Sequence, residues 1–492
     1  MVRLRRVLLP DAASLCVTAL AAAIALSPPK SFDLFFHLAS GRDLLAHGFP
    51  ARDPFSFTAS GPQFPHEWPF GIVAELSARA FGAAGPELLV ALLFAATALL
   101  LWHLLGPRPS RGMLATVLFV LVLEALSPTF AQERPWHFGQ LLFVALLLLL
   151  RAYRAGSARA GLLVLPLTAL WANLHASWPL APALFGLTAL GMASDPAPRR
   201  AAAGVGLSAA AFLCAGASIP GPALYLYPLR HALLPSTAGL VEWMPLALDL
   251  PFARAYFMLL LLAVFFTGRT RKAPLALVLP AAALAAGAVL VIRLVPFAAL
   301  ALAAAIAEMA EGTRGVGGAW GRVFAGVDRG LRRWNGAAGG GVLPFAAVGI
   351  VAMLAAHRPG SLEARLPRED YPVAALHALE GAPPGRVLAR LRWGGAVAYF
   401  APGHPVFIDG RNDLFPAAIH EAYVKMKLLE PGWREAFAAA RPDYVLWGPV
   451  HHGTPLLAAL GWMGWREVAG DATGSLWIPP PARAPGARGD AR

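Results

Sequence analysis

Residues 138–150 of the chain read FGQLLFVALLLLL, an apolar run with one polar side chain, Gln140. The polar segment QERPWH precedes it at 132–137, and Arg151 and Arg154 follow it. A helix that crosses a bilayer needs about 20 mostly apolar residues, and its cytoplasmic end tends to collect arginine and lysine. The stretch therefore predicts a membrane-spanning helix with one basic end and one end that carries polar and ionisable side chains.

Runs of this kind recur along most of the chain. The 492 residues are 57% hydrophobic and 14% charged, whereas a soluble chain carries roughly 25% charged residues. These proportions exclude a soluble enzyme and a disordered chain. Eleven candidate spans are centred in Val7–Pro28, Glu87–Leu105, Leu114–Leu126, Phe138–Leu150, Gly161–Leu174, Ser177–Ala193, Ala201–Ser218, Phe252–Thr267, Pro274–Ile292, Leu294–Ile306 and Val342–Ala356. We therefore predict an α-helical polytopic membrane protein with about 11 transmembrane helices.

The distribution of arginine and lysine predicts the orientation of the spans. With the N-terminus inside, the inner segments hold 18 of these residues and the outer loops before the last span hold eight. This asymmetry follows the positive-inside rule, so the formal charge of +13 is a topology signal and does not support binding of nucleic acid. We expect a multi-pass protein of the bacterial cytoplasmic (inner) membrane, with a cytoplasmic N-terminus and an extracytoplasmic C-terminal domain.

The first apolar run has a second interpretation. Arg3, Arg5 and Arg6 precede it and small residues follow, as in a cleaved signal peptide. The residues from Ser31 onward do not resemble the N-terminus of a mature soluble protein, which favours a spanning helix over a signal peptide. The two cysteines, Cys16 and Cys214, lie in apolar runs and offer neither a disulfide framework nor a cysteine metal site.

The first outer loop, residues 30–85, carries ionisable side chains. Apolar residues at helical spacing predict a short interfacial helix that begins near Asp33, with His37 one turn later on a shared face. A second such helix follows Glu67 and Trp68. A carboxylate here suits a general base, with His37 as its tuning partner; the alternative is that Asp33 caps a helix. His66 and Glu67 either contact substrate or anchor the loop, and the four side chains lack the tight spacing of a metal site.

Polar residues also mark the outer ends of later spans. Arg134 and Arg293 suit a phosphate, because guanidinium gives permanent charge and paired hydrogen bonds. The alternative for each is snorkelling to a headgroup or an internal pair, for Arg134 with Glu133. His137 and His175 are further candidates for substrate binding, and His175 reads equally well as a satisfied histidine of the helix bundle.

The C-terminal part reads as a small α/β domain over residues 357–479, followed by a disordered tail at 480–492. Residues 1–356 form the transmembrane domain in this division. We expect helices at Tyr371–Glu380, Ile419–Leu429 and Trp433–Ala440, and strands at Arg386–Leu391, Val397–Phe400, Pro405–Ile408, Tyr444–Trp447 and Ser475–Ile478. Asp409 and Arg411 flank a glycine directly after one of these strands. They either contribute to a binding crevice or form an ion pair that holds the turn.

Several of these motifs together resemble the GT-C glycosyltransferase superfamily. The resemblance rests on Asp33, His37 and Gly41 after the first span, and on DPFSFT at 53–58 and HEW at 66–68. It also rests on the stretch with Trp171, Asn173 and His175 and on the Asp409-Gly410-Arg411 segment. It implies many spans, two interfacial helices in the first outer loop, a catalytic acid after the first span and a polyprenyl-phosphate sugar donor. Asp33 matches the catalytic position, but Leu34 stands where many members have a second acidic residue.

The leading hypothesis is an inverting glycosyltransferase that transfers a sugar from a polyprenyl-phosphate donor to a glycan or protein acceptor of the envelope. No cofactor is predicted, and a divalent metal is conceivable without support from the sequence. The alternative is a non-enzymatic membrane scaffold whose outer domain binds envelope glycan or a partner protein. A transporter is a third possibility, disfavoured because the ionisable residues gather at one face and no inverted repeat is apparent.

Overall fold

A computed structural model describes residues 11–59, 61, 67–106, 111–129, 132–194, 198–227, 241–270, 272–311, 318–337, 347, 349–351, 366–448 and 455–481. The chain forms two compact units. The first comprises residues 1–27 and 65–360, and the second comprises residues 28–64 and 361–492. Residues 28–64, which the sequence pattern groups with the transmembrane part, thus share a unit with the C-terminal domain.

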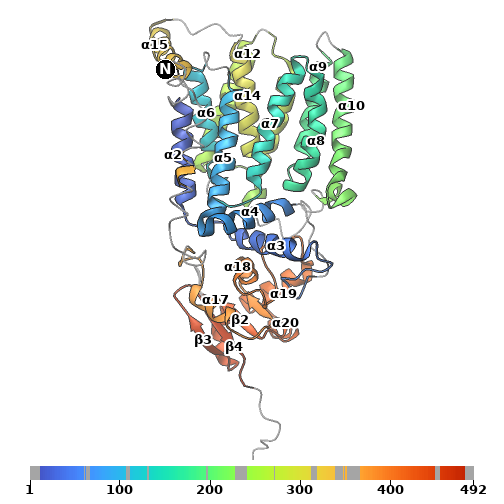
Figure 1. Cartoon of the computed structure of the whole chain (residues 1–492), viewed down its shortest axis with the longest axis vertical. Coiled ribbons are helices and arrows are strands. Elements are labelled where there is room, and N and C mark those ends of the chain that lie inside the picture. The colour runs from blue at the N-terminus through green and yellow to red at the C-terminus, as the bar shows by residue number, and fades with distance from the viewer. Residues whose placement is uncertain are drawn as a thin grey trace, which may run out of the picture. The chain divides into compact units, whose positions relative to one another are not determined.

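The first unit is a bundle of mostly apolar helices (Figure 1). Its helices are α2 (Ala12–Leu26), α4 (Trp68–Phe81), α5 (Gly85–Leu104), α6 (Met113–Leu126), α7 (Trp136–Arg154), α8 (Ala158–Leu174), α9 (Leu180–Met192), α10 (Pro198–Cys214), α12 (Pro251–Arg269), α13 (Leu275–Leu290), α14 (Val295–Glu311) and α15 (Gly318–Ala337). Five helical segments are long and apolar enough to cross a membrane, and five shorter apolar helices accompany them in the described part of the chain. The protein is therefore a multi-pass membrane protein. Ten of the expected spans coincide with helices, and the eleventh, Val342–Ala356, lies mostly outside the described residues.

Local signals explain where these helices begin and end. Asp11 caps α2 by accepting a hydrogen bond from the backbone of Ser14 at 2.7 Å, and Ser157 caps α8 in the same manner. The helix α7 follows Pro135 and has Arg151 and Arg154 in its last turn. Their positive charges are attracted to the negative, C-terminal end of the helix dipole.

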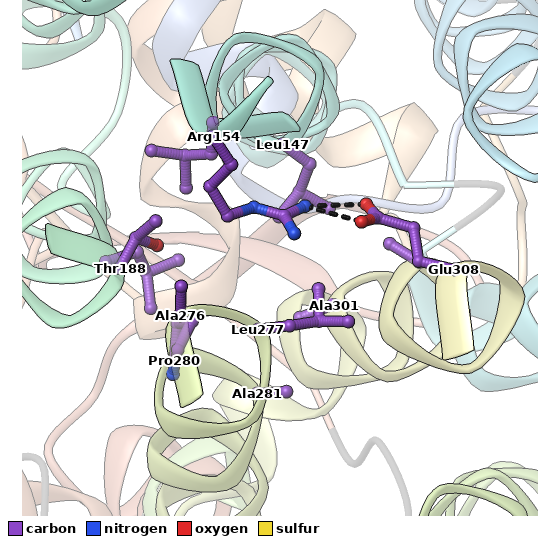
Figure 2. Close-up of a pocket in the computed structure, with 12 residues that line it drawn as sticks. Leu147, Arg154, Thr188, Ala276, Leu277, Pro280, Ala281, Ala301 and Glu308 are labelled. Carbon is purple, nitrogen blue, oxygen red and sulfur yellow. Dashed lines mark hydrogen bonds and ion pairs between the residues drawn. The ribbon is translucent and has the colours of Figure 1, made fainter. Parts of the chain in front are cut away.

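One ion pair joins α7 to α14 inside the bundle. Arg154 Nη2 donates to both carboxylate oxygens of Glu308, at 2.7 and 2.8 Å. The pair lines a cavity of about 30 Å³ whose other walls are Thr188 and apolar side chains of α7, α9, α13 and α14 (Figure 2). Because α7 and α14 both end here, the contact fixes two helix ends at the same side of the bundle.

The second unit is a small mixed sheet covered by helices. It contains α3 (Asp33–His47), α17 (Val373–Glu380), β1 (Val387–Ala389), α18 (Gly394–Phe400), α19 (Ala417–Leu428), α20 (Trp433–Ala440), β2 (Tyr444–Trp447), α21 (Pro455–Trp462), β3 (Arg466–Gly470) and β4 (Ser475–Ile478). The strand order is β1-β2-β4-β3, with β1 and β2 parallel and the other neighbours antiparallel. The edge strand β3 was not expected from the sequence; it is largely exposed, begins with two charged residues and carries a bulge.

The first loop extends this sheet beyond β1. The backbone N–H of Val406 donates to the carbonyl of Phe55 at 2.8 Å, and the N–H of Phe57 donates to the carbonyl of Val406 at 3.2 Å. Phe407 in turn donates to Val387 of β1 at 2.8 Å. Residues 55–57 therefore run parallel to residue 406 as an added edge, and this pairing binds the first loop to the C-terminal domain.

The expected strand at Val397–Phe400 is wrong, because these residues form the end of helix α18. Short apolar runs do not distinguish a buried strand from a buried helix. The helix starts at two glycines in close contact with neighbouring segments. A Cβ on Gly394 would lie 2.4 Å from the Cβ of Asp409, and one on Gly395 would lie 2.9 Å from the backbone nitrogen of Phe36. The helix therefore depends on tertiary contacts that the local sequence does not display.

Candidate functional site

Two arginines of the first unit converge on one carboxylate. Arg134 Nη1 lies 2.8 Å from Glu242 Oε1, and Arg293 Nη1 lies 3.4 Å from Glu242 Oε2. The three side chains are 27%, 32% and 36% exposed, so none of them is enclosed by the protein. Both arginines were expected to bind an anion, and the structure brings them together. Glu242 belongs to a loop whose residues received no role from the sequence.

Short-range packing positions this cluster. The guanidinium of Arg134 lies 5.2 Å from the ring centroid of Trp136, and that of Arg293 lies 5.8 Å from the ring of Trp243. The segment that carries Glu242 is fixed beside Arg293, because Ile292 donates its backbone N–H to the carbonyl of Met244 at 3.0 Å. The cluster holds two cations and one anion, so it retains a net positive charge that favours a further or replacement anion.

The two histidines near the ends of α7 and α8 make contacts inside the bundle. His137 is buried, and its Nε2 lies 3.0 Å from the carbonyl oxygen of Gln132. His175 Nδ1 accepts a hydrogen bond from the backbone N–H of Ser177 at 3.2 Å and lies 2.6 Å from the hydroxyl of Ser177. Because a backbone N–H only donates, Nδ1 of His175 carries no proton and the neutral ring is protonated on Nε2. These contacts engage Nε2 of His137 and Nδ1 of His175, whereas the buried Nδ1 of His137 has no hydrogen-bond partner among the described residues. The substrate roles of both histidines stay predictions.

The start of α4 is anchored to the end of α8. Trp68 Nε1 donates to Asn173 Oδ1 at 3.0 Å, and the backbone N–H of Ile219 donates to the same oxygen at 3.1 Å. Glu67 is the residue that precedes α4. His66 lies outside the described residues.

In the second unit, Arg411 is buried between two aspartates. Arg411 Nη2 lies 2.5 Å from Asp409 Oδ2, and Arg411 Nη1 contacts Asp53 Oδ2. Its aromatic neighbours are Phe36 and Phe55, whose ring centroids lie 4.4 and 5.6 Å from the guanidinium carbon of Arg411. Burial alone would lower the pKa of Arg411, but Asp409 and Asp53 outweigh it and raise the pKa above its ordinary value. The guanidinium therefore stays charged and is committed to the two carboxylates.

This triad explains the role of the Asp53-Pro54 turn. Oδ1 of Asp53 accepts backbone hydrogen bonds from Phe55 at 3.0 Å and from Ser56 at 2.8 Å, and its carboxylate also holds Arg411. The sequence suggested an Asp409–Arg411 pair as one interpretation of the turn, and the structure shows that pair. It also shows Asp53 as a third member, which the sequence presented only as a turn residue.

Asp33 lies against the same turn. It stands in the first turn of α3, is half-buried, and its backbone N–H donates to the hydroxyl of Ser31 at 3.3 Å. A Cβ added to Gly410 would lie 3.0 Å from Asp33 Oδ1. The turn that joins Asp409 to Arg411 therefore has a glycine where a side chain would press on the Asp33 carboxylate. His37 is buried one turn further along α3, with its ring 5.5 Å from that of Phe36.

Two aspartates of this unit, Asp53 and Asp409, are poorly placed to hold a metal ion. The carboxylates of Asp53 and Asp409 are occupied by Arg411. Across the described residues, no group of three or more His, Cys, Asp or Glu side chains is arranged to bind a metal.

Comparison with known proteins gives matches among solved structures. No protein-family model matches the chain, and no curated protein matches it by sequence. The chain is similar to the oligosaccharyltransferase AglB of Archaeoglobus fulgidus, solved with a tethered acceptor peptide containing the NVT sequon. The TM-score is 0.51 at 12% identity, over 88% of this chain and 69% of that chain. The complex of that enzyme with an inhibitory peptide and a dolichol-phosphate gives the same values.

A further match is ArnT from Cupriavidus metallidurans in the apo state, with a TM-score of 0.48 at 14% identity, over 94% of this chain and 96% of that chain. At such identities the likeness to the oligosaccharyltransferase concerns the fold alone. The fold expected from the first outer loop and the outer domain is present: the chain has a GT-C-like architecture over most of its length.

Proposed function

We propose that this protein is an inverting membrane glycosyltransferase that moves a sugar from a polyprenyl-phosphate donor to a glycan or protein acceptor of the cell envelope. The observation that carries the proposal is the convergence of Arg134 and Arg293 on Glu242. A phosphate diester of a lipid carries one negative charge before transfer and up to two after the sugar has left. Two accessible guanidinium groups that already hold one carboxylate are suited to that change in charge.

The fold supports the same class of substrate. The oligosaccharyltransferase of the same architecture was solved with a dolichol-phosphate and with an acceptor peptide. A lipid-linked donor also agrees with a site carried by membrane helices, since the donor can enter from the bilayer. The sugar and the acceptor are left open.

The reaction needs few groups from the protein. The oxygen of an acceptor hydroxyl attacks the anomeric carbon of the sugar, and the bond from that carbon to the phosphate oxygen breaks. The electron pair of that bond leaves with the polyprenyl phosphate, and the hydroxyl proton passes to the carboxylate of Asp33. Arg134 and Arg293 stabilise the charge that develops on the phosphate, which makes a separate acid unnecessary. His37 is proposed to tune Asp33.

The buried triad gives Asp33 a rigid neighbour. Because Asp53 and Asp409 hold Arg411 from two segments, the turn at Gly410 has little freedom to move. A catalytic group works best when the residues around it are themselves held by packing and hydrogen bonds. Asp409 and Arg411 are thus proposed to position Asp33, in place of the direct substrate contacts expected from the sequence.

The test uses the whole protein in lipid nanodiscs. Radiolabelled polyprenyl-phosphate sugars are presented with envelope acceptors, and donor binding and label transfer are measured separately. The Asp33→Asn variant is expected to bind the donor and to lose transfer. The matched control is Asp43→Asn on the same helix, which removes a carboxylate paired with His47 at 2.8 Å and is expected to transfer normally. Full transfer by Asp33→Asn would overturn the assignment of Asp33 as the general base. Absence of donor binding by the wild-type protein would favour the scaffold alternative.

A further inference from the structure

The helix α15 is fastened to the starting ends of two membrane helices. Asp328 Oδ1 accepts a hydrogen bond from the backbone N–H of Met113 at 2.8 Å, at the first residue of α6. The buried side chain of Asn335 donates to the carbonyl of Arg111 at 2.7 Å and accepts from the N–H of Ala12 at 3.3 Å. Figure 1 shows α15 beside the ends from which α2 and α6 start. The helix therefore lies at the level where spanning helices begin.

These contacts are specific to the starts of helices. The first N–H groups of a helix have no partner within the helix, and a carboxylate there also favours the positive end of the helix dipole. Asp328 supplies that carboxylate to α6 from another helix. The residue before α6 is Gly112, where a Cβ would lie 1.9 Å from Asp328 Oδ1. The chain thus leaves room for this contact.

One face of α15 carries three large apolar side chains that are each exposed over more than two fifths of their surface. Val323, Val327 and Trp334 are 57%, 50% and 44% exposed. They are four and seven positions apart, so at about 100° per residue they form a single stripe along the helix. Exposed apolar residues in one stripe need an apolar neighbour.

A basic face accompanies the apolar stripe. Arg329 and Arg333 are exposed and point roughly 100–140° away from the stripe by helical geometry. Arg332 shares the carboxylate of Asp328, with Nε 2.5 Å from Oδ2. Residues 318–337 hold four arginines and one aspartate, a formal charge of +3. The partner of this helix must offer both an apolar layer and negative charge.

We propose that α15 lies in the surface of the bilayer and binds anionic phospholipids. A basic amphipathic helix with valine and tryptophan on one side and arginine on the other lies in the plane of the interface. Arginines at this depth are attracted to anionic headgroups. Attachment to the starts of α2 and α6 holds α15 at the height where headgroups and acyl chains meet. An anionic bilayer therefore matches both the charge and the apolar stripe, and the helix links the lipid composition to two spanning helices.

The position of the stripe is tested with one fluorescent label at a time. In a variant whose Cys16 and Cys214 are replaced by serine, an NBD group is attached to Val327→Cys or to Gly336→Cys. These positions are nine apart, so they face opposite sides of α15 by helical geometry. A Cβ at Gly336 meets no atom within 4 Å, so the control label fits. In nanodiscs that contain phosphatidylglycerol, the label at 327 is expected to be quenched by spin-labelled lipid and protected from iodide, and the label at 336 is expected to show the reverse.

The charge is tested by lipid retention. Native mass spectrometry measures the preference for phosphatidylglycerol, as the ratio of bound phosphatidylglycerol to bound phosphatidylcholine. The wild type is compared with Arg329→Gln/Arg333→Gln and with the control Arg434→Gln in the second unit. The preference is expected to fall about fivefold for each arginine removed from α15 and to stay unchanged in the control. Iodide access to the label at 327 in every lipid mixture would overturn the proposal. So would protection of that label only in discs that hold two copies of the protein, which would assign the stripe to a protein contact.

Discussion

Arg411 and Asp53 are separated by 358 positions in the chain, yet their side chains form a buried ion pair. Asp409 completes the triad from two positions before Arg411. The pair ties the turn at Asp53 to the turn at Asp409, and the added edge at residues 55–57 repeats that connection through the backbone. Residues 28–64, the first part of the first outer loop, therefore belong to the C-terminal unit through both side-chain and main-chain bonds.

Replacing Arg411 by methionine should destabilise the second unit strongly. The change leaves two buried carboxylates without their cation, which costs about 3–5 kcal/mol of unfolding free energy. Denaturant unfolding of the purified protein, followed by the fluorescence of a label on the C-terminal unit, measures the loss. Arg434→Met removes an exposed arginine of the same unit and should change the free energy by less than about 0.5 kcal/mol. Equal effects of the two substitutions would contradict a special role of the triad.

Replacing Glu242 by glutamine should strengthen the binding of a polyprenyl phosphate. The carboxylate is the anion already held by Arg134 and Arg293, so its removal leaves both guanidinium groups to the lipid phosphate. We expect the dissociation constant to fall about tenfold for Glu242→Gln and to rise about tenfold for Arg134→Gln, as for a charge-assisted hydrogen bond. Titration of undecaprenyl phosphate in nanodiscs measures both. Glu308→Gln, which removes the carboxylate partner of Arg154, serves as the control. Weaker lipid binding by Glu242→Gln would contradict the prediction and would show that Glu242 holds the two arginines in place.

Adding a methyl group at Gly410 should reduce sugar transfer more than stability. The new Cβ would lie 3.0 Å from Asp33 Oδ1, so the carboxylate must shift by a few tenths of an ångström. Small displacements of a reacting group lower rates steeply, and we expect a loss of about tenfold in kcat for Gly410→Ala. Gly403→Ala is the control, since its Cβ would meet only Pro384, at 3.5 Å or more. Unchanged transfer by Gly410→Ala would speak against Asp33 as the base.

Two glycines of neighbouring helices should respond oppositely to alanine. A Cβ on Gly191 of α9 would lie 2.3 Å from the backbone nitrogen of Ala276 in α13, whereas a Cβ on Gly206 of α10 meets nothing within 4 Å. Gly191→Ala should therefore separate α9 from α13 and cost about 1–3 kcal/mol. Gly206→Ala should be neutral or stabilise its helix by up to about 1 kcal/mol. Thermal unfolding in detergent compares the two, and equal melting temperatures would argue against close packing of α9 on α13.

Much of the membrane part could be predicted from residue order alone. Ten expected spans coincide with helices, because a spanning helix satisfies its own backbone and needs only a long apolar run. The helices at the start of the first loop and before the second span were also predictable, as α3 and α4, from apolar spacing and from Pro69 in a first turn. The strand expected at Val397–Phe400 failed because a run of four residues carries no usable periodicity.

The residues suited to a lipid phosphate were also recognisable by type. Arg134 and Arg293 stood out because an ionisable side chain at the end of a span is costly unless it is paired or functional. Glu242 did not stand out, since it lies in a proline-rich loop with several other polar residues. The carboxylate that joins the two arginines is visible only once α7, α14 and that loop are packed together.

Hydropathy, charge asymmetry and helix signals are properties of consecutive residues. They are therefore enough to predict a polytopic helical membrane protein with a small C-terminal α/β domain. Tertiary structure alone decided that residues 55–57 join the C-terminal sheet and that Asp53 meets Arg411. It also decided that Arg134 and Arg293 share Glu242. The physical reason is that these contacts join separate segments of the chain, with 108 positions between Arg134 and Glu242 and 358 between Asp53 and Arg411. Their formation depends on the packing of whole helices and strands, which no local pattern encodes.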